Sequence, residues 1–190
     1  MNTPVKVIAM AGSLRKNSFN HTLAKLVAEQ ALNAGAEVEV VTLSDYDIPF
    51  FNEDIEQQGP VADVESLKAK IRDADALIIA TPEYNGSISG VLKNALDWVS
   101  RTAPDAKPAF ANTTVAMVAT SPGGLGGIRG FAHTRDVFVG MGALVLSQQL
   151  AVGNAYQAFN EQGQFSDEHS AKQAQTLAQN LVTTAAKLKQ

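Results

Sequence analysis

The sequence predicts an α/β protein, a three-layer sandwich in which helices cover both faces of a five-stranded parallel β-sheet. Short apolar runs that are typical of strands alternate along the chain with stretches whose apolar residues recur at helical spacing. One run, residues 76–80, is apolar at every position, as expected for a parallel strand that is buried on both faces. Strict alternation of strand and helix implies a parallel sheet with helices on both sides.

The pattern gives five strands and five helices. The strands are expected at residues 5–11, 38–43, 76–80, 114–120 and 143–146. The helices are expected from 18 to 34, from 61 to 74, around 92–99, from the glycine-rich turn after the fourth strand to about 141, and over 174–188. A side-chain oxygen of Asn17 or Ser18 is expected to cap the first helix, and Gly35 to end it. Glu37 and Glu39 alternate with valines, which places the second strand at a sheet edge.

Right-handed crossovers leave few ways to connect these elements. Five strands fit the flavodoxin-like order 2-1-3-4-5, and in such sheets ligands bind beyond the carboxyl ends of the strands. With no repeat and no linker, residues 1–190 are expected to form one domain. The segment 44–60 is long for a loop in a compact domain, and loops of that length are often functional.

Composition narrows the possible function classes. Hydrophobic residues make up 45% of the chain and charged residues 18%, which excludes a disordered protein. The net charge of −4 and the scattered Lys and Arg residues argue against a nucleic-acid partner. The early apolar run, residues 5–12, is far shorter than the roughly 18 residues of a membrane span. No secretory signal pattern is present, so we expect no membrane contact and a cytoplasmic location.

The sequence contains no cysteine, which excludes disulfides, thiolate metal sites and cysteine nucleophiles. The three histidines, His21, His133 and His169, are dispersed without metal-ligand spacing, so no metal site is expected. If the protein carries out redox chemistry, a bound cofactor must therefore carry the electrons.

The loop after the first strand, residues 12–20, combines several groups that bind phosphate. Ser13 and Ser18 offer hydroxyls, two asparagines offer amides, and the start of a helix attracts anions through its free N–H groups. Arg15 adds a charge-assisted contact to phosphate oxygens. The Gly-x-Gly-x-x-Gly fingerprint is absent, so a terminal monophosphate fits better than a pyrophosphate. The alternative is that Ser18 and Asn20 only cap the helix while Arg15 is solvated.

The loops after the third and fourth strands meet the first loop at the same edge of the sheet. In residues 81–87, Pro82 and Gly86 fix a tight turn whose backbone can face a flat heterocycle, although a plain strand-to-helix connection is the alternative. The glycines of residues 121–127 let the backbone approach a ligand closely, although a flexible hinge would also need them.

Together these segments resemble the NADPH-dependent FMN reductase family, a flavodoxin-like group that includes bacterial quinone and chromate reductases and azoreductases. The resemblance covers nearly the whole chain. It rests on three motifs in order: Gly12-Ser-Leu-Arg-x-x-Ser-x-Asn20, then Pro82-Glu-Tyr-Asn-Gly86 running into Leu92-Lys-Asn-Ala-Leu-Asp-Trp98, and Ser121-Pro-Gly-Gly-Leu-Gly-Gly127.

The resemblance implies FMN as the cofactor, NADPH or NADH as the co-substrate, and a homodimer or homotetramer in which residues 48–54 reach toward a neighbouring subunit. It implies that the FMN phosphate is held by Ser13, Arg15, Ser18 and Asn20. The isoalloxazine would be lined by Pro82, Glu83, Tyr84, Asn85 and Gly86, with its other edge closed by Ser121, Gly123 and Gly124.

The expected function is electron transfer from NAD(P)H through FMN to a quinone, a flavin, an azo compound or a metal oxyanion, by a ping-pong mechanism. Because the cofactor supplies the reactive atom, we assign no catalytic side chain. A flavodoxin-type electron carrier and an FMN-sensing protein are the alternatives, although such carriers tend to be more acidic. Trp98 is expected to pack at the end of its helix. Three roles stay open for Arg129 and Arg135: contact with a nucleotide phosphate, a place in a subunit interface, or an exposed ion pair.

Overall fold

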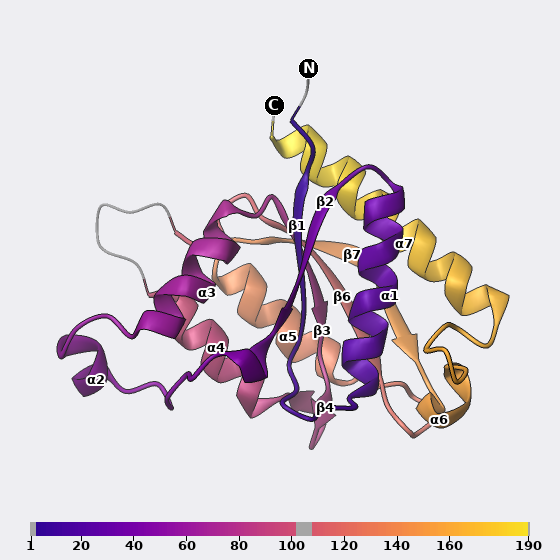
Figure 1. Cartoon of the computed structure of the whole chain (residues 1–190), viewed down its shortest axis with the longest axis horizontal. Coiled ribbons are helices and arrows are strands. Elements are labelled where there is room, and N and C mark those ends of the chain that lie inside the picture. Colours follow the sequence, from indigo (N-terminus) through magenta and orange to yellow (C-terminus); the bar gives the residue numbers. More distant parts are fainter. Residues whose placement is uncertain (1–2, 102–107, 190) are drawn as a thin grey trace.

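The structure, a computed structural model, describes residues 3–101 and 108–189 (Figure 1). Its main sheet contains β1 (Lys6–Ala11), β2 (Glu37–Thr42), β3 (Ala76–Ala80), β6 (Thr114–Thr120) and β7 (Leu144–Val152). All neighbouring strands are parallel, and the order is β2-β1-β3-β6-β7. Numbered along the chain, this is the predicted 2-1-3-4-5 order, which is therefore confirmed.

Helices cover both faces of the sheet (Figure 1). One face packs against α1 (Phe19–Asn33) and α7 (Glu168–Leu188), and the other against α3 (Ala62–Asp73), α4 (Gly90–Ser100) and α5 (Gly130–Gly140). Alternate residues of a strand point to opposite faces. Val7 and Ala9 of β1 accordingly join the core under α1 and α7, whereas Ile8 and Met10 join the core under the other three helices.

Shorter elements occupy the loops. They are the 3₁₀ turn η1 (Leu43–Asp45), the helices α2 (Glu53–Gln57) and α6 (Ala155–Ala158), and the two-stranded ribbon of β4 (Glu83–Tyr84) and β5 (Ser87–Ile88). The β4 ribbon and α6 both lie at the lower edge of the view in Figure 1, where the carboxyl ends of β1, β3 and β6 also lie. This edge is the one at which the sequence predicted a ligand site.

The start of α1 differs from the prediction. Ser18 is the N-cap residue, but its side chain makes no capping hydrogen bond with any described residue. Capping by side chain does occur at Ser89, which accepts from the Leu92 N–H at 3.2 Å, and at Asp167, which accepts from Ser170 N–H at 2.8 Å. Gly35 follows α1 with φ of +90°, so the predicted helix end is confirmed.

The fifth strand is longer than predicted, nine residues instead of four. Three polar residues after Leu146 hid its continuation; because β7 is an edge strand, Ser147 is exposed and Gln148 and Gln149 are half-buried. Its register against β6 shifts between Val115 and Met117, a β-bulge. The Arg135 guanidinium donates to the carbonyls of Val145 and Leu146 at 3.2 and 2.7 Å. Arg135 therefore binds the backbone of β7 beside the bulge, a structural role.

The long segment after β2 is fixed to α4. The Pro49 carbonyl accepts hydrogen bonds from Asn94 Nδ2 at 2.9 Å and from Trp98 Nε1 at 2.8 Å. The Phe51 ring packs edge-on against Trp98, with ring centroids 5.0 Å apart. Trp98 therefore packs at the end of its helix, as predicted. Within the described residues, no helix is both long and apolar enough to cross a membrane.

Candidate functional site

A hollow of about 370 Å³ opens at the carboxyl edge of the sheet, and we call it the carboxyl-edge hollow. Small-molecule sites typically fall between about 300 and 1,000 Å³. The loops after β1, β3, β6 and β7 all contribute to its walls. The lining residues are Ser13, Arg15, Ser18, Phe19, Asn20, Pro82, Glu83, Tyr84, Thr120, Ser121, Pro122 and Tyr156.

Eight of the twelve residues implied by the resemblance line this hollow, namely Ser13, Arg15, Ser18, Asn20, Pro82, Glu83, Tyr84 and Ser121. The other four lie next to it without lining it. Asn85 and Gly86 form the tip of the ribbon, and Gly123 and Gly124 belong to the turn after β6. The three loops that the sequence singled out thus converge on one place.

The loop after β1 begins at a glycine with no room for a side chain. Gly12 donates its N–H to the Ala80 carbonyl at 2.9 Å, and its own carbonyl accepts from the Ser89 hydroxyl at 2.7 Å. A Cβ on Gly12 would lie 2.6 Å from the Cβ of Leu92. These contacts hold the start of the loop against β3 and α4, so the position of Ser13 is fixed by the sheet itself.

The charge in this loop comes from Arg15. Its guanidinium carbon lies 5.4 Å from the centroid of the Phe19 ring, a cation–π geometry. The Ser13 and Ser18 side chains are buried beside it. His21 adds no charge at neutral pH, because burial lowers its pKa, although the hydrogen bond to Ser13 opposes that shift. Its Nε2 lies 3.0 Å from the Ser13 carbonyl, which can only accept, so Nε2 carries the proton.

Asn20 lines the hollow and also makes a long-range contact with the end of β6. Its side-chain amide donates to the Thr120 carbonyl at 2.9 Å and accepts from the Thr120 N–H at 3.1 Å. The contact is buried and joins residues 100 positions apart in the sequence. Asn20 therefore ties the loop after β1 to the end of β6.

The segment after β3 forms a hairpin rather than a plain connection to α4. Strands β4 and β5 pair antiparallel across the two residues Asn85 and Gly86, whose φ angles are +53° and +76°. Positive φ at both central residues is what a type I′ turn requires, and Asn-Gly is its preferred sequence. The dipeptide was thus a visible signal for the hairpin. Tyr84 stands exposed on this ribbon.

The glycine turn after β6 packs directly on the chain that follows β7. A Cβ on Gly126 would lie 2.7 Å from the Val152 carbonyl carbon, and one on Gly153 would lie 2.4 Å from the Gly124 oxygen. Two backbone hydrogen bonds join the same segments, from Asn154 N–H to the Gly123 carbonyl and from Ala155 N–H to the Ser121 carbonyl. Here the glycines serve close approach between two backbones.

This packing brings to the site residues that the sequence did not predict: Phe19, Thr120, Pro122 and Tyr156. Tyr156 belongs to α6 and is 76% exposed, with its ring centroid 5.0 Å from that of Phe19. Its only sequence signal is an aromatic residue soon after the last strand. Because α6 reaches the hollow through the Gly124–Gly153 contact, that signal could not be read without the fold.

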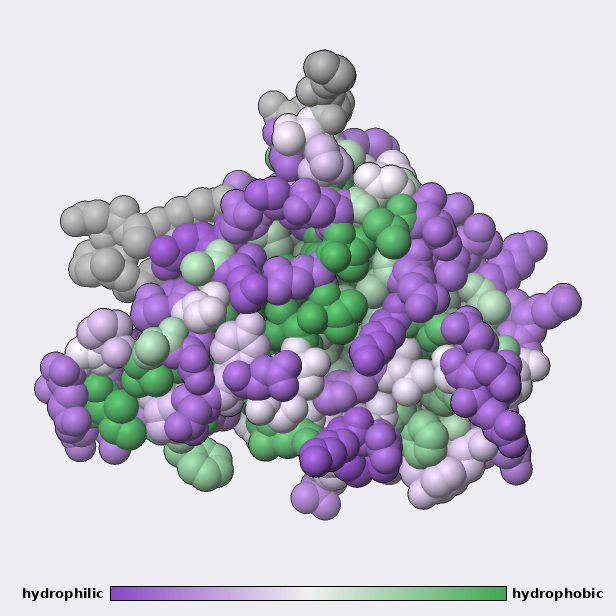
Figure 2. Space-filling view, in the orientation of Figure 1, coloured by the Kyte–Doolittle hydropathy of each residue, from purple (hydrophilic) through white to green (hydrophobic). Residues whose placement is uncertain are grey.

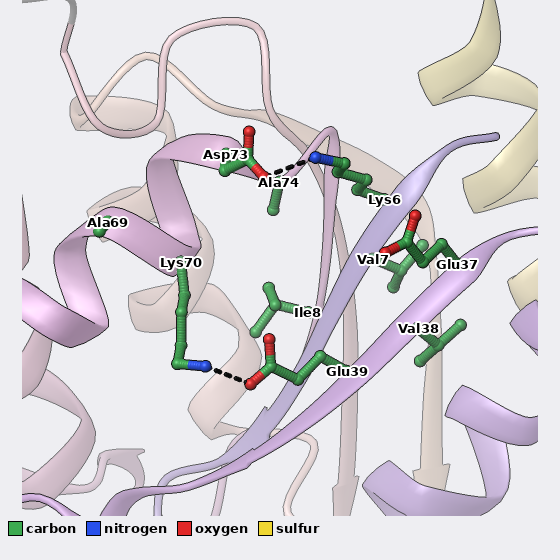
Figure 3. A pocket seen from close by; sticks show the side chains of 10 residues that line it. All are labelled: Lys6, Val7, Ile8, Glu37, Val38, Glu39, Ala69, Lys70, Asp73 and Ala74. Carbon is green, nitrogen blue, oxygen red and sulfur yellow. Dashed lines mark hydrogen bonds and ion pairs between the residues drawn. The ribbon is translucent and has the colours of Figure 1, made fainter. Parts of the chain in front are cut away.

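A second hollow, of about 430 Å³, lies over the amino-terminal halves of β1 and β2 beside α3 (Figure 3). We call it the amino-end hollow. Ile8 points into it, and two ion pairs bridge from the strands to the helix. They are Lys6–Asp73, at 2.6 Å, and Lys70–Glu39. Figure 2 shows apolar surface on this face of the molecule with hydrophilic side chains around it. Both lysines in the lining are already paired with carboxylates and Glu37 adds a further negative charge, so this hollow is not the candidate site for an anionic group.

The comparisons with known proteins agree with the carboxyl-edge geometry. A sequence model described as NADPH-dependent FMN reductase matches residues 5–157. The chain belongs to this family. It is 36% identical to an NAD(P)H-dependent FMN reductase of Pseudomonas aeruginosa over 182 residues, which cover 95% of each chain. It is 40% identical to a quinone reductase of Escherichia coli over 159 residues, covering 83% of this chain and 81% of that one.

Solved structures give the same result. The flavoenzyme FerB, an NAD(P)H:(acceptor) oxidoreductase from Paracoccus denitrificans, superposes with a TM-score of 0.83 and 32% identity, covering 96% of this chain and 98% of that one. This chain is therefore an enzyme, an oxidoreductase of a family that uses FMN and NAD(P)H. Among the described residues, no group of three or more His, Asp or Glu side chains is placed to hold a metal ion.

Proposed function

We propose that this enzyme binds one FMN in the carboxyl-edge hollow and transfers electrons from NADPH or NADH to a small acceptor. The acceptor classes are quinones, free flavin, azo compounds and metal oxyanions. The proposal depends on one observation: three loops meet around one hollow. The first holds a helix start with a cation and two hydroxyls, and the other two form its walls. Bound FMN would supply the chemistry of accepting a hydride and passing the electrons on.

The residues present fit such a cofactor. At the phosphate end, Ser13, Arg15 and Ser18 line the hollow together, and both serines are buried. The Ser13 hydroxyl accepts from the Arg15 N–H at 3.3 Å, and the Ser18 hydroxyl is not used as a cap to any described N–H. The helix start adds N–H donors and the positive end of its dipole. Asn20 would act by holding this loop to Thr120. These groups suit one terminal phosphate, which favours FMN over FAD.

The two walls would hold the flat ring system. Pro82, Glu83 and Tyr84 would form one of them, with Asn85 and Gly86 at its tip, and Ser121 the other, with Gly123 and Gly124 behind it. Since both walls come from fixed loops, one face of the ring would stay open. Donor and acceptor would then occupy that face in turn, which is a ping-pong mechanism. No side-chain nucleophile is needed, and the task of these residues is to bind, to orient and to limit access of water.

Anaerobic stopped-flow measurements test this proposal. NADPH or NADH alone should bleach the flavin absorbance in a fast first step, and a small quinone should restore it in a second step. Steady-state double-reciprocal plots should be parallel, and the cofactor released by heating should be FMN. Bleaching no faster than that of free FMN would contradict the proposal. Slow reduction by free nucleotide but fast reduction by a partner reductase would instead indicate an electron carrier.

We also propose a homodimer or homotetramer. A further hollow of about 430 Å³ lies between the loop after β1, the segment after β2 and α4, and it is lined largely by apolar side chains such as Leu14, Tyr46, Ile48 and Val91. Phe50 lies on its rim and is 87% exposed. Exposed apolar clusters of this kind mark interfaces. Light scattering at micromolar concentration should give twice or four times the chain mass, and Phe50→Asp should shift it toward the monomer.

Two further parts of the proposal concern the whole chain. We propose that residues 1–190 fold as one FMN-binding domain, because the two cores share a single sheet. Thermal unfolding followed by fluorescence and by circular dichroism should then give coincident single transitions. We propose a cytoplasmic location, which cell fractionation tests.

A further inference from the structure

An ion pair joins one wall of the carboxyl-edge hollow to the start of α5. Glu83 accepts two hydrogen bonds from Arg129, from Nε at 2.8 Å and from the backbone N–H at 3.1 Å, and its carboxylate lies 2.7 Å from Nη2 as an ion pair. The two side chains differ in exposure. That of Glu83 is 9% exposed, whereas that of Arg129 is 67% exposed. A nearly buried carboxylate in the wall of the hollow is thus neutralised by a residue at the surface.

Two more side-chain contacts run parallel to this pair. The Thr81 and Thr134 hydroxyls lie 3.1 Å apart, and His133 Nδ1 lies 2.8 Å from the Ser87 hydroxyl. Together with the ion pair, they fasten the segment that carries the β4–β5 hairpin to the start of α5. Arg129 is the N-cap residue of α5, so the Glu83 carboxylate also meets the positive end of that helix.

Glycines make the close approach possible. A Cβ on Gly127 would lie 3.6 Å from the Glu83 Cβ and 3.1 Å from the Ala119 Cβ, and a Cβ on Gly130 would lie 3.6 Å from the Glu83 Cβ. The glycine turn therefore packs against Glu83 on one side, and Arg129 binds its carboxylate. Among the described strands β4 and β5 pair only with each other, so contacts with the glycine turn and the start of α5 join the hairpin to the rest of the fold.

We propose that Arg129 is a positioning residue for the FMN site. By neutralising Glu83 and binding it at two guanidinium nitrogens, it fixes the β4–β5 hairpin as a rigid, electrically neutral wall. This inference rests on the proposed function, since the wall is meant to hold FMN. It assigns Glu83 the role of an anchor for that wall, in addition to lining the hollow.

Because Glu83 is far less exposed than Arg129, the proposal predicts different effects for changes at the two residues. Without the Arg129 side chain, Glu83 would keep one backbone N–H but lose its counter-charge while staying almost buried, which is costly. The hairpin would have to open to hydrate the carboxylate. Removing the charge from Glu83 as well should relieve this cost. Loss of Arg129 alone should therefore be worse than loss of Arg129 combined with Glu83→Gln.

The test compares wild type, Arg129→Ala, Arg129→Lys, Glu83→Gln and the double variant Glu83→Gln/Arg129→Ala. FMN is titrated into each apoprotein by flavin fluorescence. Arg129→Ala should raise the Kd about tenfold, the weight of one hydrogen bond to a charged group. Arg129→Lys should recover part of the affinity, and the double variant should lie within about threefold of wild type.

The midpoint potential of the bound flavin gives a second readout. In Arg129→Ala the uncompensated negative charge should shift it to a more negative value, and the double variant should restore it. Lys6→Ala, which breaks the ion pair at the opposite end of the sheet, is the matched control and should change neither quantity. Circular dichroism of every apoprotein checks that the fold is intact.

Two outcomes would overturn the inference while the proposed function stands. Either Arg129→Ala binds FMN as tightly as wild type does, or the double variant is as weak as Arg129→Ala and has the same shifted potential. If the wild-type apoprotein failed to bind FMN at all, the proposed function would fail first, and the positioning role would fail with it.

Discussion

The two ends of the sheet carry hollows of similar size but opposite chemistry. At the amino end, about 430 Å³ is bridged by Lys6–Asp73 and Lys70–Glu39, so each cation in its lining already has a carboxylate partner in the protein. At the carboxyl edge, about 370 Å³ is lined by Arg15, which forms no ion pair with a described residue, and by two buried serines. Size alone would favour the wrong hollow. The donors that the protein leaves free identify the site.

The turns at the two ends of the sheet also differ in how tightly they are packed. Gly35 turns the chain from α1 into β2 with open space around it, and nothing lies within 4 Å of where its Cβ would be. At the carboxyl edge, Gly12 packs against the start of α4, and Gly126 and Gly153 lie where the turn after β6 meets the chain after β7. The amino-end turn only reverses the chain, whereas the carboxyl-edge loops are packed on one another and held in shape.

Gly126→Ala and Gly35→Ala test this difference with one chemical change. Both glycines have positive φ, which costs an alanine roughly 1–2 kcal/mol. Only at Gly126 does the new Cβ also meet backbone atoms, at 2.7 to 2.9 Å, which adds an overpacking cost of roughly 1–3 kcal/mol. Chemical denaturation should therefore show a loss of roughly 2–5 kcal/mol for Gly126→Ala and roughly 1–2 kcal/mol for Gly35→Ala.

The same pair should also separate in FMN affinity, with a weaker complex for Gly126→Ala and an unchanged one for Gly35→Ala. Equal destabilisation by the two substitutions would mean that the turn after β6 yields easily, and the idea of a preformed site would then be wrong.

Arg15→Ala tests whether the unpaired charge marks the ligand end. A hydrogen bond to a charged group contributes about 1.5–3 kcal/mol, which is roughly a 10- to 150-fold change in dissociation constant. FMN binding to the apoprotein should weaken by that amount, while the melting temperature of the apoprotein stays close to that of wild type. Lys16→Ala removes the neighbouring charge as a control. An unchanged affinity in Arg15→Ala would make Arg15 a solvated surface residue.

Local sequence signals were sufficient for the order of strands and for the three convergent loops. The strands at 76–80 and 114–120 were predicted to the residue, because both are buried and their apolar runs end where the burial ends. Ser13, Arg15 and Ser18 could be proposed because they surround a helix start, which is itself a local feature. Signals of this kind require no knowledge of what packs nearby.

The remaining features depend on partners far away in the sequence. Polar residues in the middle of β7 hide its continuation, and Arg135 of α5 donates to the carbonyls of the two residues before them. Nothing local reveals that Thr120 engages both ends of the Asn20 amide. Glu83 and Arg129 meet across 46 positions, and Tyr156 reaches the hollow only through a contact between two glycines. Each of these is a tertiary contact that no periodicity encodes.

The smallest expected effect belongs to the amino-end hollow, and Lys6→Ala tests it. The hydrogen bond from Lys6 lowers the pKa of Asp73, and both side chains are largely exposed, at 41% and 72%. Exposed pairs of this kind contribute little to stability. Because the folded-state pKa of Asp73 is depressed, its contribution is present above the unfolded-state pKa and is lost as pH falls through the folded value. The difference in stability between wild type and Lys6→Ala should therefore be small at neutral pH and vanish in acid.

FMN affinity should not change in Lys6→Ala at any pH. A loss of FMN binding in this variant would show that the two ends of the sheet are coupled. The contrast between the ion-paired amino-end hollow and the carboxyl-edge hollow as the ligand site would then be wrong.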